Sequence, residues 1–169
     1  MIENITNITP RIENCIERKL IGIKLTMCIE LNKTAELWSS FMPRKKEISN
    51  ILNLDLISLQ VYKNNHFSAF SLHDEFEKWA CVEVSHFAKI PQGMEALTLQ
   101  DGLYAVFNYT GSSNDPRIFE YIYGTWIPDS GYILDHRPHF EVLGNKYKNN
   151  DPHSEEEIWI PIQPKPVQS

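Results

Sequence analysis

The chain has 169 residues, 42% of them hydrophobic and 22% charged, which is the usual range for a folded globular protein. This length favours one domain spanning residues 1–169, and no run of about 18 apolar residues is present that would cross a membrane. The 16 Lys and Arg against 22 Asp and Glu give a net charge of −6, which disfavours a nucleic-acid-binding protein.

The first half of the chain predicts a strand, a helix and two further strands. Enrichment in Ile and Leu predicts a strand over 19–30. Apolar residues at helical spacing predict a helix over 34–48, which Pro43 breaks or kinks. Alternation of apolar and polar residues predicts strands over 56–63 and 76–84.

The second half predicts the same order of elements. A strand over 102–110 precedes a helix that Asp115 caps and Pro128 ends. A short strand over 139–143 follows, and strict alternation of isoleucines with other residues predicts a last strand over 156–162.

The order strand-helix-strand-strand therefore occurs twice, in halves of about 15–90 and 100–163. The two helices also end alike, because Pro43 and Pro128 follow similar apolar residues and lie 85 positions apart. This duplication predicts an α+β fold with pseudo-twofold symmetry, antiparallel sheets, one main helix per half and a central groove between the halves. Two terminal segments are expected to be loose: 1–12 and 164–169.

Alternation predicts which side chains of the last strand face the groove. The isoleucines of 156–162 suit the face that the helix covers, so Glu157 and Trp159 are predicted to face the groove. The same argument in the strand 76–84 predicts that Trp79 and Glu83 face the groove as well.

Three further side chains depend on the same reasoning. Since Phe140 and Val142 suit the core, Glu141 is predicted to face the groove, and Tyr62 is a candidate to join it. In the strand 102–110 both faces are apolar, so alternation does not orient Tyr109.

Carboxylates among aromatic rings are typical of a cation-binding site, because the ring faces and the Glu carboxylates both attract positive charge. The alternative for Glu83, Glu141 and Glu157 is a solvated sheet face, which the pattern alone slightly favours. Packing between the halves is an equal alternative for Trp79 and Trp159. Nine side chains form the predicted ligand-binding set: Trp38, Tyr62, Trp79, Glu83, Tyr109, Trp126, Glu141, Glu157 and Trp159.

Other constellations are weaker. Trp38 and Trp126 lie on the helices, where core packing is favoured over ligand binding. His136 and His139 have no third ligand at metal-site spacing, so no metal and no cofactor is predicted. Three cysteines without a CxxC pair argue against disulfides, and no secretory signal is visible, so a cytoplasmic location is expected.

Several motifs together resemble the GyrI-like small-molecule-binding domains, also called bacterial transcription-activator effector-binding domains. They are W-x-P-x-SGY at 126–132, RP-x-FE at 137–141 and E-x-W-IPI at 157–162, and the helix sequence LWSSFMPRKKEI at 37–48 is similar too. The resemblance covers roughly residues 8–164.

The resemblance implies a fold of two SHS2-type repeats around a pocket for amphipathic, often cationic, organic molecules. It places the family's pocket glutamate at Glu141 and the acidic position of the last strand at Glu157, with Trp159 as its aromatic neighbour. Where many members carry a tyrosine, this chain has Leu143. A helix-turn-helix domain is not expected here, and neither is direct binding to DNA.

These observations favour a stand-alone module that senses or sequesters an amphipathic, cationic small molecule, in a setting of transcription regulation or resistance to drugs or toxins. The first alternative is a hydrolase of reactive small molecules that uses Glu141 or Glu157 as a general base. The second alternative is a protein that interacts with gyrase. Sequence alone does not separate binding from catalysis, because both use the same residues.

Overall fold

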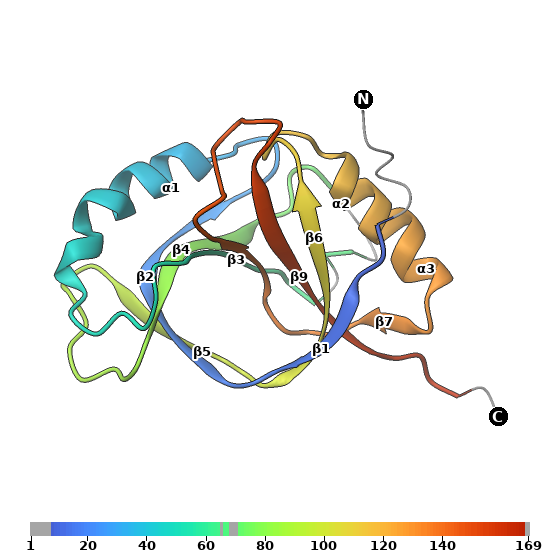
Figure 1. Cartoon of the computed structure of the whole chain (residues 1–169), viewed down its shortest axis with the longest axis horizontal. Coiled ribbons are helices and arrows are strands. Elements are labelled where there is room, and N and C mark those ends of the chain that lie inside the picture. The colour runs from blue at the N-terminus through green and yellow to red at the C-terminus, as the bar shows by residue number, and fades with distance from the viewer. Residues whose placement is uncertain (1–7, 65, 68–70, 168–169) are drawn as a thin grey trace.

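The computed structural model describes residues 8–64, 66–67 and 71–167, which form a strongly curved antiparallel sheet with helices on its outside (Figure 1). The strands are β1 (Arg11–Cys15), β2 (Arg18–Met27), β3 (Leu56–Val61), β4 (Phe76–Val84), β5 (Glu95–Leu99), β6 (Gly102–Thr110), β7 (Tyr132–Leu134), β8 (His139–Leu143) and β9 (Glu155–Pro164). The helical segments are α1 (Thr34–Phe41), a 3-10 helix η2 (Met42–Glu47), α2 (Arg117–Tyr121), a π-helix η3 (Ile122–Trp126) and α3 (Ile127–Asp129).

The strand order β5-β2-β4-β3-β8-β9-β6-β1 confirms the duplicated α+β fold. Outward from the central pair of β3 and β8, each strand of one half has a counterpart in the other, as a pseudo-twofold axis requires. The halves join edge to edge, because β3 and β8 form an antiparallel ladder in which Ser58 lies opposite Glu141. The two halves therefore belong to one continuous sheet.

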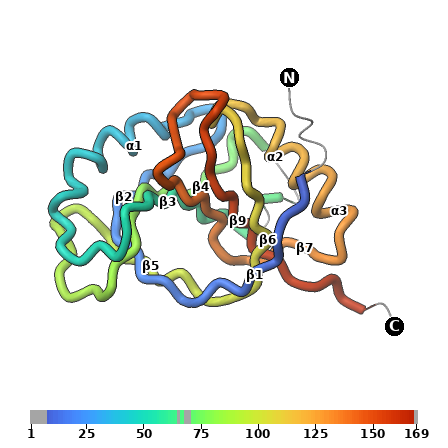
Figure 2. Tube along the Cα trace, in the orientation of Figure 1, coloured from blue at the N-terminus to red at the C-terminus, as the bar shows by residue number. Residues whose placement is uncertain are grey.

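A bent ribbon joins the far ends of the sheet. The pairing of β1 with β6 and that of β2 with β5 keep one register, from Arg11 opposite Val106 to Gly22 opposite Glu95. Only residues 16–17 and 100–101 interrupt it, at the lower edge of the view (Figure 2). The ribbon and the central pair together close the sheet into a roll with an inner and an outer face.

Both faces of the rolled sheet are packed. The inner face holds a cluster of large side chains that includes Leu59, Trp79, Tyr104, Phe140 and Trp159. On the outer face, α1 packs over β2 and β4, and the helical segment of the second half packs over β6 and β9. A strand in the middle of the sheet therefore has apolar core on both of its faces. The outer face of β3 and β8 lies between the two helical segments.

The predicted helices are confirmed with local changes of geometry. Pro43 lies where α1 passes into the 3-10 helix η2, as expected for a residue that cannot donate a helical hydrogen bond. Asp115 accepts a hydrogen bond of 3.0 Å from the backbone N–H of Arg117 and so caps the second helical segment. That segment continues through Pro128 and ends at Asp129.

Three short strands were missed by the sequence patterns: β1, β5 and β7. Because β1 includes Arg11 and Ile12, the expectation of a loose segment 1–12 is wrong for those two residues, and residues 1–7 lie outside the described part. These strands are short and lie at sheet edges, where pairing rather than hydrophobic alternation defines the strand.

Gly22 permits the close approach of β2 to β4, which gives the first prediction. A Cβ atom at Gly22 would collide with the backbone oxygen of Ala80 and with Cys81, whereas a Cβ at Gly124 in η3 meets nothing within 4 Å. We expect Gly22→Ala to lower the free energy of unfolding by about 1–3 kcal/mol in urea denaturation. The control Gly124→Ala is expected to raise it by less than about 1 kcal/mol, because alanine restricts the unfolded chain. Equal effects of the two substitutions would contradict this account.

Candidate functional site

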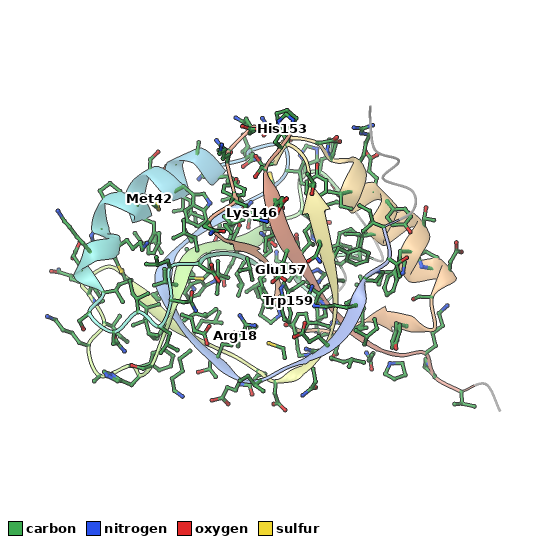
Figure 3. The ribbon with its side chains drawn as sticks, viewed as in Figure 1. Arg18, Met42, Lys146, His153, Glu157 and Trp159 are labelled. Carbon is green, nitrogen blue, oxygen red and sulfur yellow. The ribbon has the colours of Figure 1, made fainter. Side chains whose placement is uncertain are left out.

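The inner face carries four of the predicted side chains, in the predicted orientation. Trp79 and Trp159 belong to the inner cluster, each with only 4% of its surface exposed. Glu157 and Trp159 point from β9 to the inside of the roll, where Arg18 of β2 also lies (Figure 3). Glu83 reaches the same face and lies 3.9 Å from the Arg18 guanidinium.

The chain's own basic residues already occupy this combination of carboxylates and indole rings. The Arg18 guanidinium lies 5.0 Å from the ring centre of Trp159. Arg11 donates a hydrogen bond of 2.6 Å to Glu157, and the Lys24 ammonium lies 5.5 Å from the ring centre of Trp79. A cationic ligand on the inner face would have to displace these internal cations, so the inner face is a packed interior.

Glu141 and Tyr62 lie on the outer face, which corrects their predicted orientation. Phe140 and Val142 were taken as facing the helix, but both pack in the inner cluster, and alternation then turns Glu141 outward. Tyr62 shares the outer face, where its ring contacts those of Phe76 and His139. The prediction failed because the sheet has apolar core on both faces, so an apolar residue does not identify the helix side.

A polar and aromatic group of side chains, which we call the seam cluster, surrounds Glu141 between the two helices. Strand β8 contributes Glu141, the neighbouring β3 contributes Gln60, and Tyr62 follows directly after β3. The other members come from β4, η3 and β9, in that order: Lys78, Tyr123 and Glu156. Glu141, Tyr62, Lys78, Tyr123 and Glu156 each keep part of their surface accessible, although protein surrounds the cluster.

The Glu141 carboxylate is incompletely satisfied. Gln60 donates a hydrogen bond to it, but its buried Oε2 atom has no hydrogen-bond partner among the described residues. Burial raises the pKa of Glu141, and the positive charge of Lys78 opposes that rise. A buried carboxylate oxygen without a partner is costly, so this position favours an added cation or donor.

Four members of the cluster were absent from the predicted set, namely Gln60, Lys78, Tyr123 and Glu156, and Glu156 is the acidic one. It lies diagonally across from Glu141, because Glu141 pairs with Ile158 in the β8–β9 ladder. Burial, together with the negative charge of Glu141, raises the pKa of Glu156 to about 8. The signal was present in the alternation, since Glu156 shares the phase of Ile158, Ile160 and Ile162 on the helix-covered face.

Aromatic rings border the carboxylates at one end of the seam. The pKa values of Tyr62 and Tyr123 are raised, mainly by burial and also by the charge of Glu141, so both phenols stay neutral and near that carboxylate. His139 shares a hydrogen bond of 2.8 Å with the Tyr123 hydroxyl. Burial lowers the pKa of His139 to about 3, so this imidazole is neutral at physiological pH.

Two cavities approach the cluster from opposite ends of the β3–β8 pair. A cavity of about 500 Å³ is lined by Asp55, just before β3, and by Glu156 and Glu157. A smaller cavity of about 220 Å³ is lined by Tyr62 and His139, at the end of β3 and the start of β8. The seam cluster is therefore reached both past Glu156 and past the aromatic rings.

The remaining predicted residues pack in the outer cores. Trp38 packs against the cluster under α1 and contacts Phe41, and Trp126 stacks on Tyr132 over the second half. Tyr109 lies on the outer face and donates a hydrogen bond of 3.0 Å to the Ser112 carbonyl. Their part in binding stays a prediction, with packing as their observed role.

The described residues contain no group of three or more His, Cys, Asp or Glu arranged to hold a metal ion. None of the helices in the described part of the chain is long and apolar enough to cross a membrane.

Three solved structures have a similar fold over nearly the whole of both chains. SAV2435, solved bound to tetraphenylphosphonium, has a TM-score of 0.70 at 16% identity, over 91% of this chain and 93% of its own. The EcmrR C-terminal domain has a TM-score of 0.70 at 14% identity, over 94% and 99% of the two chains. An integron cassette protein of Vibrio cholerae has a TM-score of 0.63 at 14% identity, over 93% and 99%.

A hydrolase of Listeria innocua has the same fold at lower similarity, with a TM-score of 0.57 and 8% identity over 92% of both chains. At such identities these structures show the fold alone. No curated protein sequence matches the chain.

The sequence profile of the integron-associated effector-binding proteins matches residues 11–162. This range begins at β1 and ends within β9, so it includes both halves and the seam cluster between them. The resemblance inferred from the sequence motifs is thereby confirmed. The chain belongs to the integron-associated effector-binding protein family, of the GyrI-like type.

Proposed function

We propose that the seam cluster binds an amphipathic organic cation, with Glu141 as the counter-charge. The observation that carries this proposal is the partly accessible residue Glu141, whose buried Oε2 atom has no hydrogen-bond partner among the described residues. Tyr62 and Tyr123 lie close enough for the charge of Glu141 to act on their phenols.

The physical chemistry of the cluster favours a cation with an apolar body. A positive charge next to Glu141 would compensate the burial of the carboxylate, which by itself raises the pKa of that group. Aromatic rings attract a cation through their faces and also cover apolar groups of the ligand. A small inorganic cation would satisfy the carboxylate but would leave the rings without a partner.

The inner face supports this function less well. Its carboxylates form ion pairs with basic residues from β1 and β2, among them Glu157 with Arg11 and Glu83 with Arg18. A ligand would gain little there, because each new contact would replace an existing one. Glu157 and Trp159 are therefore assigned to the structure of the roll, and Glu141 to the ligand.

The comparison with SAV2435 supports an aromatic monocation as the first ligand to test, since that protein was solved bound to tetraphenylphosphonium. The alternatives of hydrolysis and of interaction with gyrase are tested by no comparison and stay predictions. Hydrolysis would show as turnover of a reactive ester or epoxide that Glu141→Gln abolishes.

Removing the charge of Glu141 tests the proposed site. We expect Glu141→Gln to weaken the binding of tetraphenylphosphonium by about 10- to 100-fold in isothermal titration calorimetry, because the neutral amide offers no counter-charge. Glu83→Gln is the control, since the Glu83 carboxylate faces Arg18 on the inner face and lines neither cavity. It is expected to leave the affinity within about threefold of the original. Equal losses in both variants, or no binding to the unaltered protein, would refute the assignment.

Replacing the ring of Tyr62 tests the aromatic wall. We expect Tyr62→Leu to weaken binding of tetraphenylphosphonium by about 5- to 30-fold, because an aliphatic side chain lacks the negative ring face. Tyr62→Phe keeps the ring and is expected to bind within about threefold of the original protein. The pair of variants separates ring contact from loss of the hydroxyl, and equal affinities of the Leu and Phe variants would contradict a cation–π contact.

A further inference from the structure

The seam cluster contains two carboxylates but one nearby ammonium. Glu141 and Glu156 project from adjacent strands to the same face, on diagonal positions that long side chains bridge. Neither carboxylate forms an ion pair within the described residues, although Lys78 is close enough for its charge to act on both. Two ionised carboxylates would repel each other in this partly buried setting, so the pair favours holding a proton.

The charged groups around the pair are Lys78 of β4 and, in the cavity that Glu156 lines, Asp55 and the ion pair of Lys146 with Glu155 at 3.2 Å. The tyrosines that face the two carboxylates have raised pKa values and come from the residue after β3, from β6, from η3 and from the segment after β8: Tyr62, Tyr109, Tyr123 and Tyr147. Strand β8 adds His139, whose pKa burial lowers to about 3. Gln60 of β3 provides an uncharged hydrogen-bond donor. Among the carboxyl groups at this site, those of Glu141 and Glu156 have raised pKa values.

We propose that Glu156 is the second carboxylate of the ligand site, and that an organic cation binds to the Glu141–Glu156 pair by displacing the proton that the pair holds. This inference rests on the proposed function and extends it to Glu156 and to proton exchange. The exchange is balanced: one carboxyl O–H bond breaks, the proton passes to water or buffer, and the positive charge of the ligand takes its place. A neutral ligand of the same shape has no such exchange.

The sign of the pH dependence follows from the exchange. Burial and Glu141 raise the pKa of Glu156 to about 8 in the free protein, and a bound cation lowers the pKa of the pair. Affinity for the cation therefore increases as the pH rises toward about 8, by up to about tenfold per pH unit, and levels off above it. Tyrosine and arginine stay in one protonation state across this range.

Calorimetry in buffers of different ionisation enthalpy measures the proton directly. We expect tetraphenylphosphonium to release about 0.5–1 proton per molecule bound at pH 7, and its dissociation constant to fall as the pH rises from 6 to 8. Triphenylphosphine oxide, a neutral molecule of similar shape, is expected to release no proton.

Two variants locate the proton. Glu156→Gln is expected to retain binding of tetraphenylphosphonium while proton release falls below about 0.2 per molecule, because Glu141 then has no acidic neighbour to share a proton with. Glu83→Gln is the control, because its carboxylate faces Arg18 on the inner face and lines neither cavity, and it is expected to release the proton as the original protein does.

The outcomes separate this inference from the proposed function. The inference is overturned if the cation binds without releasing a proton, or if its affinity does not change between pH 6 and 8. Either result leaves the proposed function standing. Proton release that persists in Glu156→Gln overturns the role of Glu156. Absence of binding by the unaltered protein overturns both. The proton count and the pH dependence are measured on the unaltered protein, so a variant that fails to fold does not affect them.

Discussion

Two antiparallel pairings close the sheet: β3 with β8 in the middle, and the bent ribbon in which β1 and β2 follow β6 and β5 in one register. Closure turns one face of every strand toward a common interior. Large side chains, among them Phe140 and Trp159, then fill this interior, and the helices are left to cover the outside. The place where the halves meet is consequently open to ligands only on the outer face, between the helices.

The two faces treat carboxylates in opposite ways. On the inner face, Glu157 and Glu83 lie beside Arg11 and Arg18, so charge is neutralised within the protein. On the outer face, the Glu141 and Glu156 carboxylates share the influence of a single ammonium, that of Lys78, and their pKa values are raised. The same residue types therefore form ion pairs on one side of β9 and the proposed ligand site on the other.

A site that holds a proton in place of its ligand has a physical advantage. An unoccupied cluster with two ionised carboxylates would carry the full cost of burying like charges. Protonation removes most of that cost, and a cation that arrives later restores the ionised form. The free protein is thereby kept stable without an internal salt bridge that the ligand would have to break.

Much of the fold follows from local pattern. Alternation and helical spacing predicted β4, β6, β8 and β9, the helix from Thr34 and the cap at Asp115, because these depend on neighbouring residues. The edge strands β1, β5 and β7 escaped prediction, since their pairing partners are distant in the sequence.

The sequence by itself determined which residues share a face, such as Glu157 with Trp159 and Glu156 with Ile158. Only the tertiary structure decided which face is the interior. Alternation with a period of two separates the residues of a strand into two faces but does not say which face is the interior. In a closed sheet both faces are apolar enough to be core. For this reason Phe140 was assigned to the wrong side, and the orientation of Glu141 became known only with the roll.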